Sequence, residues 1–183
     1  MRQPPLARLW SMHDRTQRIA RLSFLAILAI YGVLCLRTPD AGRLLDGVDL
    51  AIHETGHLVF APFGQTIMVL GGTLLQLIFP ALFVACFVRN RDGFAAAVCL
   101  WWVAQNCWNI SVYVADARAQ ELPLVGGGEH DWAYLLYNAG WMMQDQALAR
   151  AIHGVGVAIF LAALWIGWRS TVDPPRGSPA ASG

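Results

Sequence analysis

The sequence contains no lysine, and charged residues make up only 14% of it. Soluble domains average about 25% charged residues, so this composition does not fit an ordinary soluble domain. All 13 basic residues are arginine, and the formal net charge is +1. No basic segment carries the interleaved aromatic residues that are typical of nucleic-acid binding. We therefore expect no nucleic-acid partner.

Cysteine is also scarce, and no two cysteines form a C-x-x-C pair. Such pairs are typical of redox sites and zinc ribbons. The four cysteines lie within apolar stretches, at Cys35, Cys86, Cys99 and Cys107. We expect them to be small buried hydrophobic residues rather than a disulfide framework or a zinc cluster.

Apolar residues are abundant, at 56% of the chain, and they come in long blocks. Four blocks, roughly 19–36, 66–88, 94–115 and 151–168, approach the ~20 residues that a helix needs to cross a bilayer. The sequence predicts an all-α fold: a polytopic membrane helical bundle of about four transmembrane helices plus one short helix. We expect residues 1–18 to form a cytoplasmic arm, 19–168 the membrane helical domain and 169–183 a disordered tail.

The arginines indicate an orientation for these spans. With four spans and an inner N-terminus, nine arginines fall on the inner side and four on the outer side, as the positive-inside rule requires. A fifth span over residues 44–61 would change this count to seven against six. We therefore expect an integral, multi-pass protein of a bacterial inner membrane, in contact with membrane lipid, with both termini cytoplasmic.

One motif lies between the first two blocks: His53-Glu54-Thr55-Gly56-His57. Residues four apart share one face of an α-helix, so both imidazoles can bind the same Zn2+ ion. Glu54 lies about 100° further round the helix, where it can reach a water on the metal instead of the metal itself. This is the H-E-x-x-H pattern of zinc hydrolases, with two ligands and one general base. Chance matches occur, but ionisable groups beside a membrane are costly and tend to be kept for function.

The motif helix is expected to end near Ala61, before Pro62 and Gly64, with Asp46 or Asp49 as its N-cap. At about 15 residues it is too short to cross a bilayer comfortably. We expect it to dip into the outer leaflet, shielded by the other helices.

A polar stripe runs along the third apolar block. Gln105, Asn109, Tyr113 and Asp116 fall within one sector of about 80° on a helix. Polar side chains are costly in lipid, so the stripe and Gln76 should face the bundle interior. The stripe is either a hydrogen-bonding seam between helices or part of the site, and Asp116 lies at the outer end, on the motif's side.

A third metal ligand has to come from another outer segment. The segment 126–131 places three glycines just before His130 and Asp131. Taken alone, Asp131 is typical of a helix N-cap and His130 of a surface imidazole. We rank His130 first, then Asp116, then Asp131, because imidazole is a common zinc ligand and the glycines give it freedom to move in. His153, near the outer end of the last span, is better explained as a bundle histidine.

The motif 53–57 in a multi-span membrane protein resembles the intramembrane zinc metalloproteases of the site-two protease kind. The resemblance implies that His53 and His57 bind Zn2+ and that Glu54 polarises the attacking water. It also implies a third ligand from an Asp-Gly pair on a later membrane helix. Asp116 is followed by alanine, and the pair Asp92-Gly93 lies on the inner side, so the third ligand stays open.

These observations favour a membrane-embedded zinc hydrolase, most simply a metallopeptidase that cleaves a membrane protein or peptide near the outer membrane surface. A zinc-dependent hydrolase of lipid amides or esters is an alternative, since the site would open toward the bilayer. A non-catalytic metal-binding membrane protein is another. The single cluster with a general-base Glu54 favours the hydrolase, because metal handling should use several repeated sites.

Overall fold

The computed structural model of the chain describes residues 5–123 and 129–172, with side chains from Arg15 onward. The helices are α1 (Pro5–Arg37), α2 (Leu44–Phe60), α3 (Gln65–Arg89), α4 (Gly93–Ala115), α5 (Asp131–Asn138) and α6 (Asp145–Val172). Two short 3-10 helices, η1 (Ala61–Phe63) and η3 (Met142–Gln144), precede α3 and α6. The described residues contain no β-strand, which confirms the predicted all-α fold.

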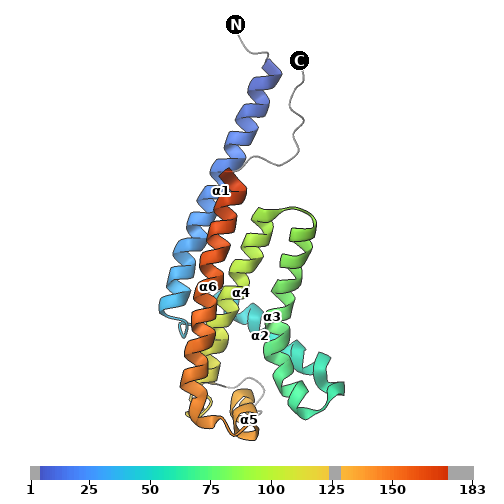
Figure 1. Cartoon of the computed structure of the whole chain (residues 1–183), viewed down its shortest axis with the longest axis vertical. Helices are drawn as coiled ribbons and strands as arrows, with labels where there is room; N and C mark the ends of the chain where they lie inside the picture. Colours follow the sequence, from blue (N-terminus) through green and yellow to red (C-terminus); the bar gives the residue numbers. More distant parts are fainter. Residues whose placement is uncertain (1–4, 124–128, 173–183) are drawn as a thin grey trace.

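Four long helices lie side by side, with α4 packed against α6, α3 and α1 (Figure 1). The short helices α2 and α5 lie toward one end of this bundle, and the α3–α4 turn lies toward the other. α2 packs mainly on α3, and α5 contacts both α3 and α4. Two short elements therefore meet at the end of the bundle where α4 finishes.

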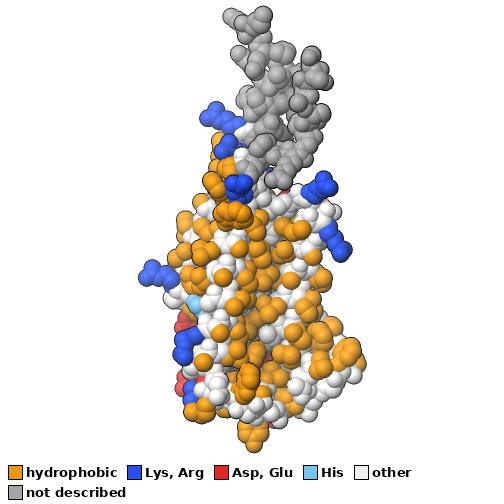
Figure 2. All heavy atoms as spheres, in the orientation of Figure 1, with side chains coloured by type: hydrophobic (Ala, Val, Ile, Leu, Met, Phe, Trp, Pro, Cys, Tyr) orange, Lys and Arg blue, Asp and Glu red, His pale blue; other side chains and the backbone are white. Residues whose placement is uncertain are grey.

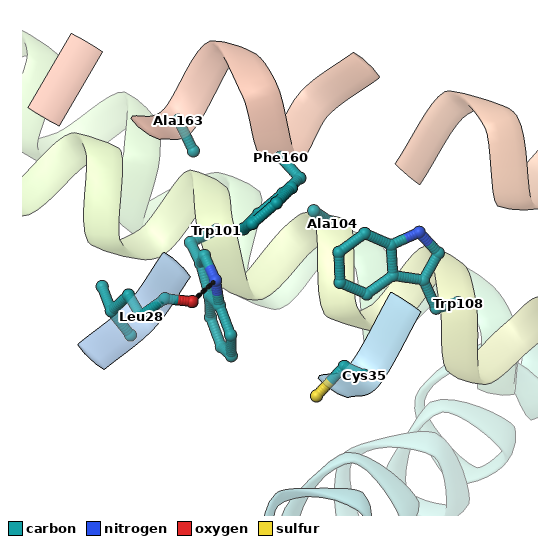
Figure 3. Close-up of a cluster of buried hydrophobic side chains, with 7 residues drawn as sticks. All are labelled: Leu28, Cys35, Trp101, Ala104, Trp108, Phe160 and Ala163. Atoms are coloured by element: carbon teal, nitrogen blue, oxygen red, sulfur yellow. Dashed lines mark hydrogen bonds between the residues drawn. The ribbon is translucent and has the colours of Figure 1, made fainter. Parts of the chain in front are cut away.

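The core forms where α4 meets α1 and α6 (Figure 3). Trp101 and Trp108 of α4 are 4% and 1% exposed, and Phe160 of α6 packs edge-on against Trp108. The Trp101 indole N–H donates to the Leu28 carbonyl of α1 at 2.9 Å, which satisfies the polar atom of a buried ring. The core thus fixes α4 as the central helix.

All four cysteines are free, as expected. Cys35 and Cys107 are buried and Cys99 is half-buried, whereas Cys86 is exposed on α3. The expectation of burial is therefore wrong for Cys86, which lies on the outer face of a helix where an exposed thiol meets no core.

Three helical segments are long and apolar enough to cross a membrane: Arg15–Arg37, Gln65–Arg89 and Met142–Val172. Large apolar side chains stay exposed along them, including Ile30, Leu82 and Leu161 at 59–66% exposure. Figure 2 shows hydrophobic side chains over the middle of the bundle, with arginines above them and further arginines along the lower left side of the view. α4, the fourth expected span, is not among the three; its polar residues lower its hydropathy.

Two helices run past boundaries expected from the sequence. α1 runs unbroken from Pro5, so most of the expected arm 1–18 belongs to the same helix as the first apolar block. α6 continues to Val172, past residue 169, where the tail is expected to begin. Residues 173–183 lie outside the described part of the chain.

The N-terminus of α2 also differs from expectation. Arg43 is the N-cap, and Asp46 lies at the third helical position, where its Oδ2 accepts the Arg43 backbone N–H at 2.7 Å. Asp49 caps nothing: it is fully buried and accepts a hydrogen bond from the Trp102 indole at 2.8 Å. Asp46 therefore supports the helix end from within the first turn, whereas Asp49 faces the interior of the bundle.

Glycines bring α2 and α3 into close contact. A Cβ on Gly56 would meet the Gly71 carbonyl group, and one on Gly72 would lie 2.5 Å from His53 Nε2. Only residues without a side chain permit this approach. The paired glycines therefore place α3 directly behind the motif.

Candidate metal centre

The motif histidines project from α2 toward the N-terminus of α5. His53 Nε2 lies 2.9 Å and His57 Nε2 3.2 Å from the same atom, Asp131 Oδ2. The ligand atoms of these three residues all lie within 4.8 Å of one another. This group could hold a metal ion.

The other nitrogen of each ring already has a partner. His57 Nδ1 lies 2.9 Å from the Met68 backbone carbonyl, and His53 Nδ1 lies 3.2 Å from Gln76 Oε1. Both partners are oxygen atoms that can accept a hydrogen bond, so a neutral ring with its proton on Nδ1 would present a lone pair on Nε2. Hydrogen bonds of this kind set the tautomer of metal-binding histidines.

This geometry fits a cation better than it fits an empty site. Two Nε2 lone pairs converge on one carboxylate oxygen of Asp131, which leaves three electron-rich atoms facing one another. Two ligand atoms about 2.1 Å from a tetrahedral zinc would lie roughly 3.4 Å apart, close to the observed separations. Two imidazoles and one carboxylate also match the donor set of catalytic zinc sites.

The α5 N-terminus holds Asp131 in place. His130 is the N-cap, and its Nδ1 accepts the Ala133 backbone N–H at 3.2 Å. The Asp131 backbone N–H donates to Tyr113 Oη of α4 at 3.1 Å. The backbone at Asp131 is therefore held at the N-terminus of α5 and against α4.

His130 and Asp116 lie in a separate arrangement. His130 is 2% exposed, and its Nε2 lies 3.3 Å from Asp116 Oδ2 without hydrogen-bonding geometry. Burial lowers the pKa of His130, and the neighbouring Asp116 carboxylate opposes that shift. Asp116 also accepts the backbone N–H groups of Glu121 and Leu122 at 2.9 and 3.1 Å.

The structure thus differs from the order of third ligands expected from the sequence. Asp131, ranked last, lies beside both motif histidines, whereas His130 and Asp116 face each other. The physical reason is that His130 fills the N-cap role and turns its ring toward α4, which leaves the next residue to face α2.

Glu54 is exposed and lines the same cavity as the three grouped residues. This cavity has a volume of about 700 Å³ and lies between α2, α3, the end of α4 and the loops beside them. Carboxylates are frequent in its wall, and no arginine contributes to it: the acidic residues are Asp40, Asp46, Glu54, Glu129 and Asp131. Apolar side chains such as Leu50, Met68 and Ile110 form much of the remainder.

The polar stripe of α4 forms hydrogen bonds to neighbouring helices and also lines the cavity. Gln105 Nε2 donates to Asp46 Oδ1 at 2.9 Å, and Asn109 accepts from Gln76 Nε2 at 2.9 Å. Asn109 and Tyr113 also line the cavity. The two alternatives that the sequence left open therefore both hold.

Two histidines stand apart from the group. His153 is half-buried on α6, with its ring centroid 6.3 Å from that of Trp108. The side chain of His13 lies outside the described part of the structure.

Sequence reasoning missed two supports of the site. The Met68 carbonyl orients His57, and no sequence signal marks a backbone acceptor. Gly72 lies under the His53 ring, and the Gly71-Gly72 pair was the sequence signal that could have predicted this close approach.

Comparison with known proteins adds no relative: no family model, curated protein or solved structure matches the chain.

Proposed function

We propose that the protein is a membrane-embedded zinc hydrolase, most simply a metallopeptidase that acts near the outer membrane surface. One observation carries this proposal: the Nε2 atoms of His53 and His57 converge on Asp131 Oδ2, while both Nδ1 atoms face oxygen atoms that can accept a hydrogen bond. A divalent cation satisfies all three atoms at once, and Zn2+ suits this donor set.

Bound Zn2+ would supply Lewis acidity and a water of lowered pKa. Glu54 would take the proton of the attacking water on its carboxylate and pass it to the leaving amine. Its exposure and its place on the cavity wall support this role. The three groups that would hold the metal are all oriented by other residues, whereas the exposed Glu54 carboxylate is free to exchange protons with the cavity.

The cavity suggests the character of the substrate. Its volume of about 700 Å³ suits a short peptide segment, and its apolar side chains suit uncharged residues. Five carboxylates and no arginine line it, so acidic substrates are disfavoured and neutral or basic ones are favoured. The same apolar wall would admit a lipid amide or ester, which makes lipid hydrolysis the second candidate.

For the membrane, we propose that α4 crosses together with the three apolar helices, because it packs along α3 and α6 at the same level (Figure 1). Asn90 then lies on the inner side and Glu121 on the outer side. Membrane-impermeant thiol labelling of Asn90→Cys and Glu121→Cys, with Cys86 replaced by Ser, should give opposite sides. Labelling of both from one side would overturn the four-span arrangement.

The function is tested by Glu54→Gln, with Glu129→Gln as the matched control. Both residues are exposed carboxylates on the cavity wall, but only Glu54 belongs to the motif. In purified protein supplied with Zn2+ and a peptide library, Glu54→Gln should lose about 10²- to 10⁴-fold in cleavage rate. It should keep its zinc, measured by elemental analysis, while Glu129→Gln stays active.

Three results would count against this function. Loss of zinc in Glu54→Gln would make Glu54 a ligand instead of a base. Equal activity of the two variants would remove Glu54 from the chemistry. Cleavage of lipid amides or esters, with the peptide library untouched, would select the second candidate.

A further inference from the structure

A hydrogen-bonded chain of side chains leads away from His53 into the bundle. His53 Nδ1 faces Gln76 Oε1 at 3.2 Å, and Gln76 Nε2 donates to Asn109 Oδ1 at 2.9 Å. Asn109 Nδ2 donates to Asp46 Oδ1 at 3.5 Å. This series of hydrogen bonds thus runs from His53 of α2 through α3 and α4 and returns to Asp46 of α2. Its central member, Gln76, is buried at 3% exposure.

The direction of this chain is fixed at its far end. An ionised carboxylate can only accept hydrogen bonds, so Asn109 must turn its amide N–H toward Asp46. Its oxygen then faces Gln76, which must turn its own N–H toward Asn109. Gln76 consequently presents its oxygen to His53, and the His53 proton must sit on Nδ1.

Asp46 is itself held in place. Its Oδ2 accepts the Arg43 N–H at the start of α2, while its Oδ1 also accepts from Gln105 Nε2 at 2.9 Å. Both oxygens are therefore occupied by donors. The acceptor that ends the chain cannot easily rotate away.

The opposing influence is Asp131. Its Oδ2 lies 2.9 Å from His53 Nε2 and would by itself favour the proton on that nitrogen. A proton on Nε2 would block the atom that binds the metal. The two carboxylates therefore compete for one imidazole proton from opposite sides.

We propose that Gln76, Asn109 and Asp46 are positioning residues that hold the His53 proton on Nδ1 and so keep Nε2 open for a metal before any metal arrives. This inference deepens the proposed metal site, and its metal-affinity readout rests on that proposal. Its tautomer readout does not, because it is made on metal-free protein.

The tautomer is measured by 15N NMR of histidine-labelled, metal-free protein at about pH 9, where an ordinary imidazole is neutral. The His53 signals are assigned by their absence in His53→Ala. The wild type should show the Nδ1–H form, whereas Gln76→Leu and Asn109→Leu should shift His53 toward Nε2–H. Asn109→Asp should keep the Nδ1–H form, because a carboxyl oxygen still accepts from Gln76.

Asn106→Leu is the matched control. It removes another fully buried amide of α4, whose Nδ2 donates to the Trp102 carbonyl at 3.0 Å, outside the path from His53 to Asp46. Metal affinity, measured by competition with a zinc chelator, should fall about 10- to 100-fold in Gln76→Leu and Asn109→Leu, as for other changes around metal ligands. Asn106→Leu should stay within about twofold of wild type.

The outcomes separate this inference from the proposed function. An Nε2–H form of His53 in the wild type overturns the inference. So does an Nδ1–H form that stays unchanged in Gln76→Leu. An equal loss of affinity in Asn106→Leu does the same, since it would reduce the effect to general loosening of the bundle. A wild type that shows the Nδ1–H form but binds no metal would refute the zinc hydrolase and leave the hydrogen-bonded chain standing.

Discussion

Two histidine–carboxylate arrangements lie next to each other at one end of the bundle, and they differ in the partner of the ring Nδ1 atom. At His53 the Nδ1 atom faces the oxygen of Gln76, so Nε2 would meet Asp131 with a lone pair if the ring proton lies on Nδ1. At His130 the Nδ1 atom accepts the Ala133 N–H, so the proton of the neutral ring lies on Nε2, 3.3 Å from Asp116 Oδ2 and without hydrogen-bonding geometry. The first arrangement would suit a cation, whereas in the second the Nε2 atom is taken by a proton.

The comparison shows that the partner of one ring nitrogen decides what the other can do. His130 and Asp131 are adjacent in the chain, yet they serve the two different arrangements. Tyr113 lies between them: its ring centroid is 4.2 Å from that of His130 and 5.9 Å from that of His53. The His130–Asp116 arrangement therefore supports the His53–Asp131 arrangement, because it fixes α5 against α4.

The largest expected effect distinguishes the two arrangements directly. Asp131→Ala should lose stoichiometric metal, because two imidazoles alone are too few protein ligands for a stable zinc site. His130→Asn should keep one metal per chain, since asparagine can replace the N-cap. Elemental analysis of both purified proteins tests this. Metal retained by the first variant and lost by the second would restore His130 to the place the sequence suggested.

Another carboxylate, the fully buried Asp49, extends the comparison because it is not paired with a histidine. Burial raises the pKa of Asp49 to about 6, while its Oδ2, Gln105 Oε1 and Asn106 Oδ1 lack hydrogen-bond partners among the described residues. The titratable groups facing it are Asp46 and Cys35. A proton on Asp49 would satisfy one of these oxygens.

The raised pKa of Asp49 decides how the stability of the protein changes with pH. The folded protein holds this proton up to about pH 6, whereas the unfolded chain releases it near 3.8. The stability contributed by protonation is thus complete below about pH 3.8 and is lost as the pH rises through 6. Asp49→Asn should therefore raise the free energy of unfolding in micelles by up to about 3 kcal/mol at pH 8 and by little at pH 4. A variant that is equally stabilised at both values would rule out this ionisation.

A smaller effect is expected at Gly72, where α3 packs against the His53 ring. In Gly72→Ala the new methyl group would lie 2.5 Å from His53 Nε2, so the ring must move away from Asp131. Metal affinity should fall by about tenfold or more, as for other disturbances around ligands. Gly154→Ala on α6 meets nothing within 4 Å and should bind metal like the wild type. Equal affinities in the two variants would show that the ring has room to adjust.

The smallest effect concerns the residue between the two arrangements. Tyr113→Phe keeps the ring but removes the acceptor of the Asp131 N–H, which is worth about 1 kcal/mol, or roughly fivefold in metal affinity. Tyr134→Phe, whose hydroxyl lies 3.5 Å from Thr66 Oγ1 at an exposed position, is the control. A chelator titration that shows no difference between the two would remove Tyr113 from the support of Asp131.

Much of the fold could be predicted from the sequence because long apolar blocks leave few alternatives to a helical bundle. The short helix carrying the motif was equally visible, since Pro62 and Gly64 stop it. α4 was harder: Gln105, Asn106 and Asn109 make it polar for a span, yet burial among neighbouring helices hides them. Whether it crosses the membrane is still a prediction.

The site was predictable only where chemistry follows local spacing. His53 and His57 are one helical turn apart, so their convergence needs no knowledge of the fold. The choice between His130 and Asp131 depends instead on which of them caps α5, and both residue types can do so. The meeting of Gln76, Asn109 and Asp46 depends on the register of three helices, which no single stretch of sequence records.

The three grouped residues come from distant points of the chain: His53 and Asp131 meet across 78 residues. At a synthesis rate of about 5–20 residues per second, the motif helix waits roughly 4 to 16 s for its partner. A chain that stops early, or inserts α3 and α4 wrongly, carries the two histidines without the carboxylate. Completion of this cluster would therefore report that these helices have been assembled, and under the proposed function a premature chain would be inactive.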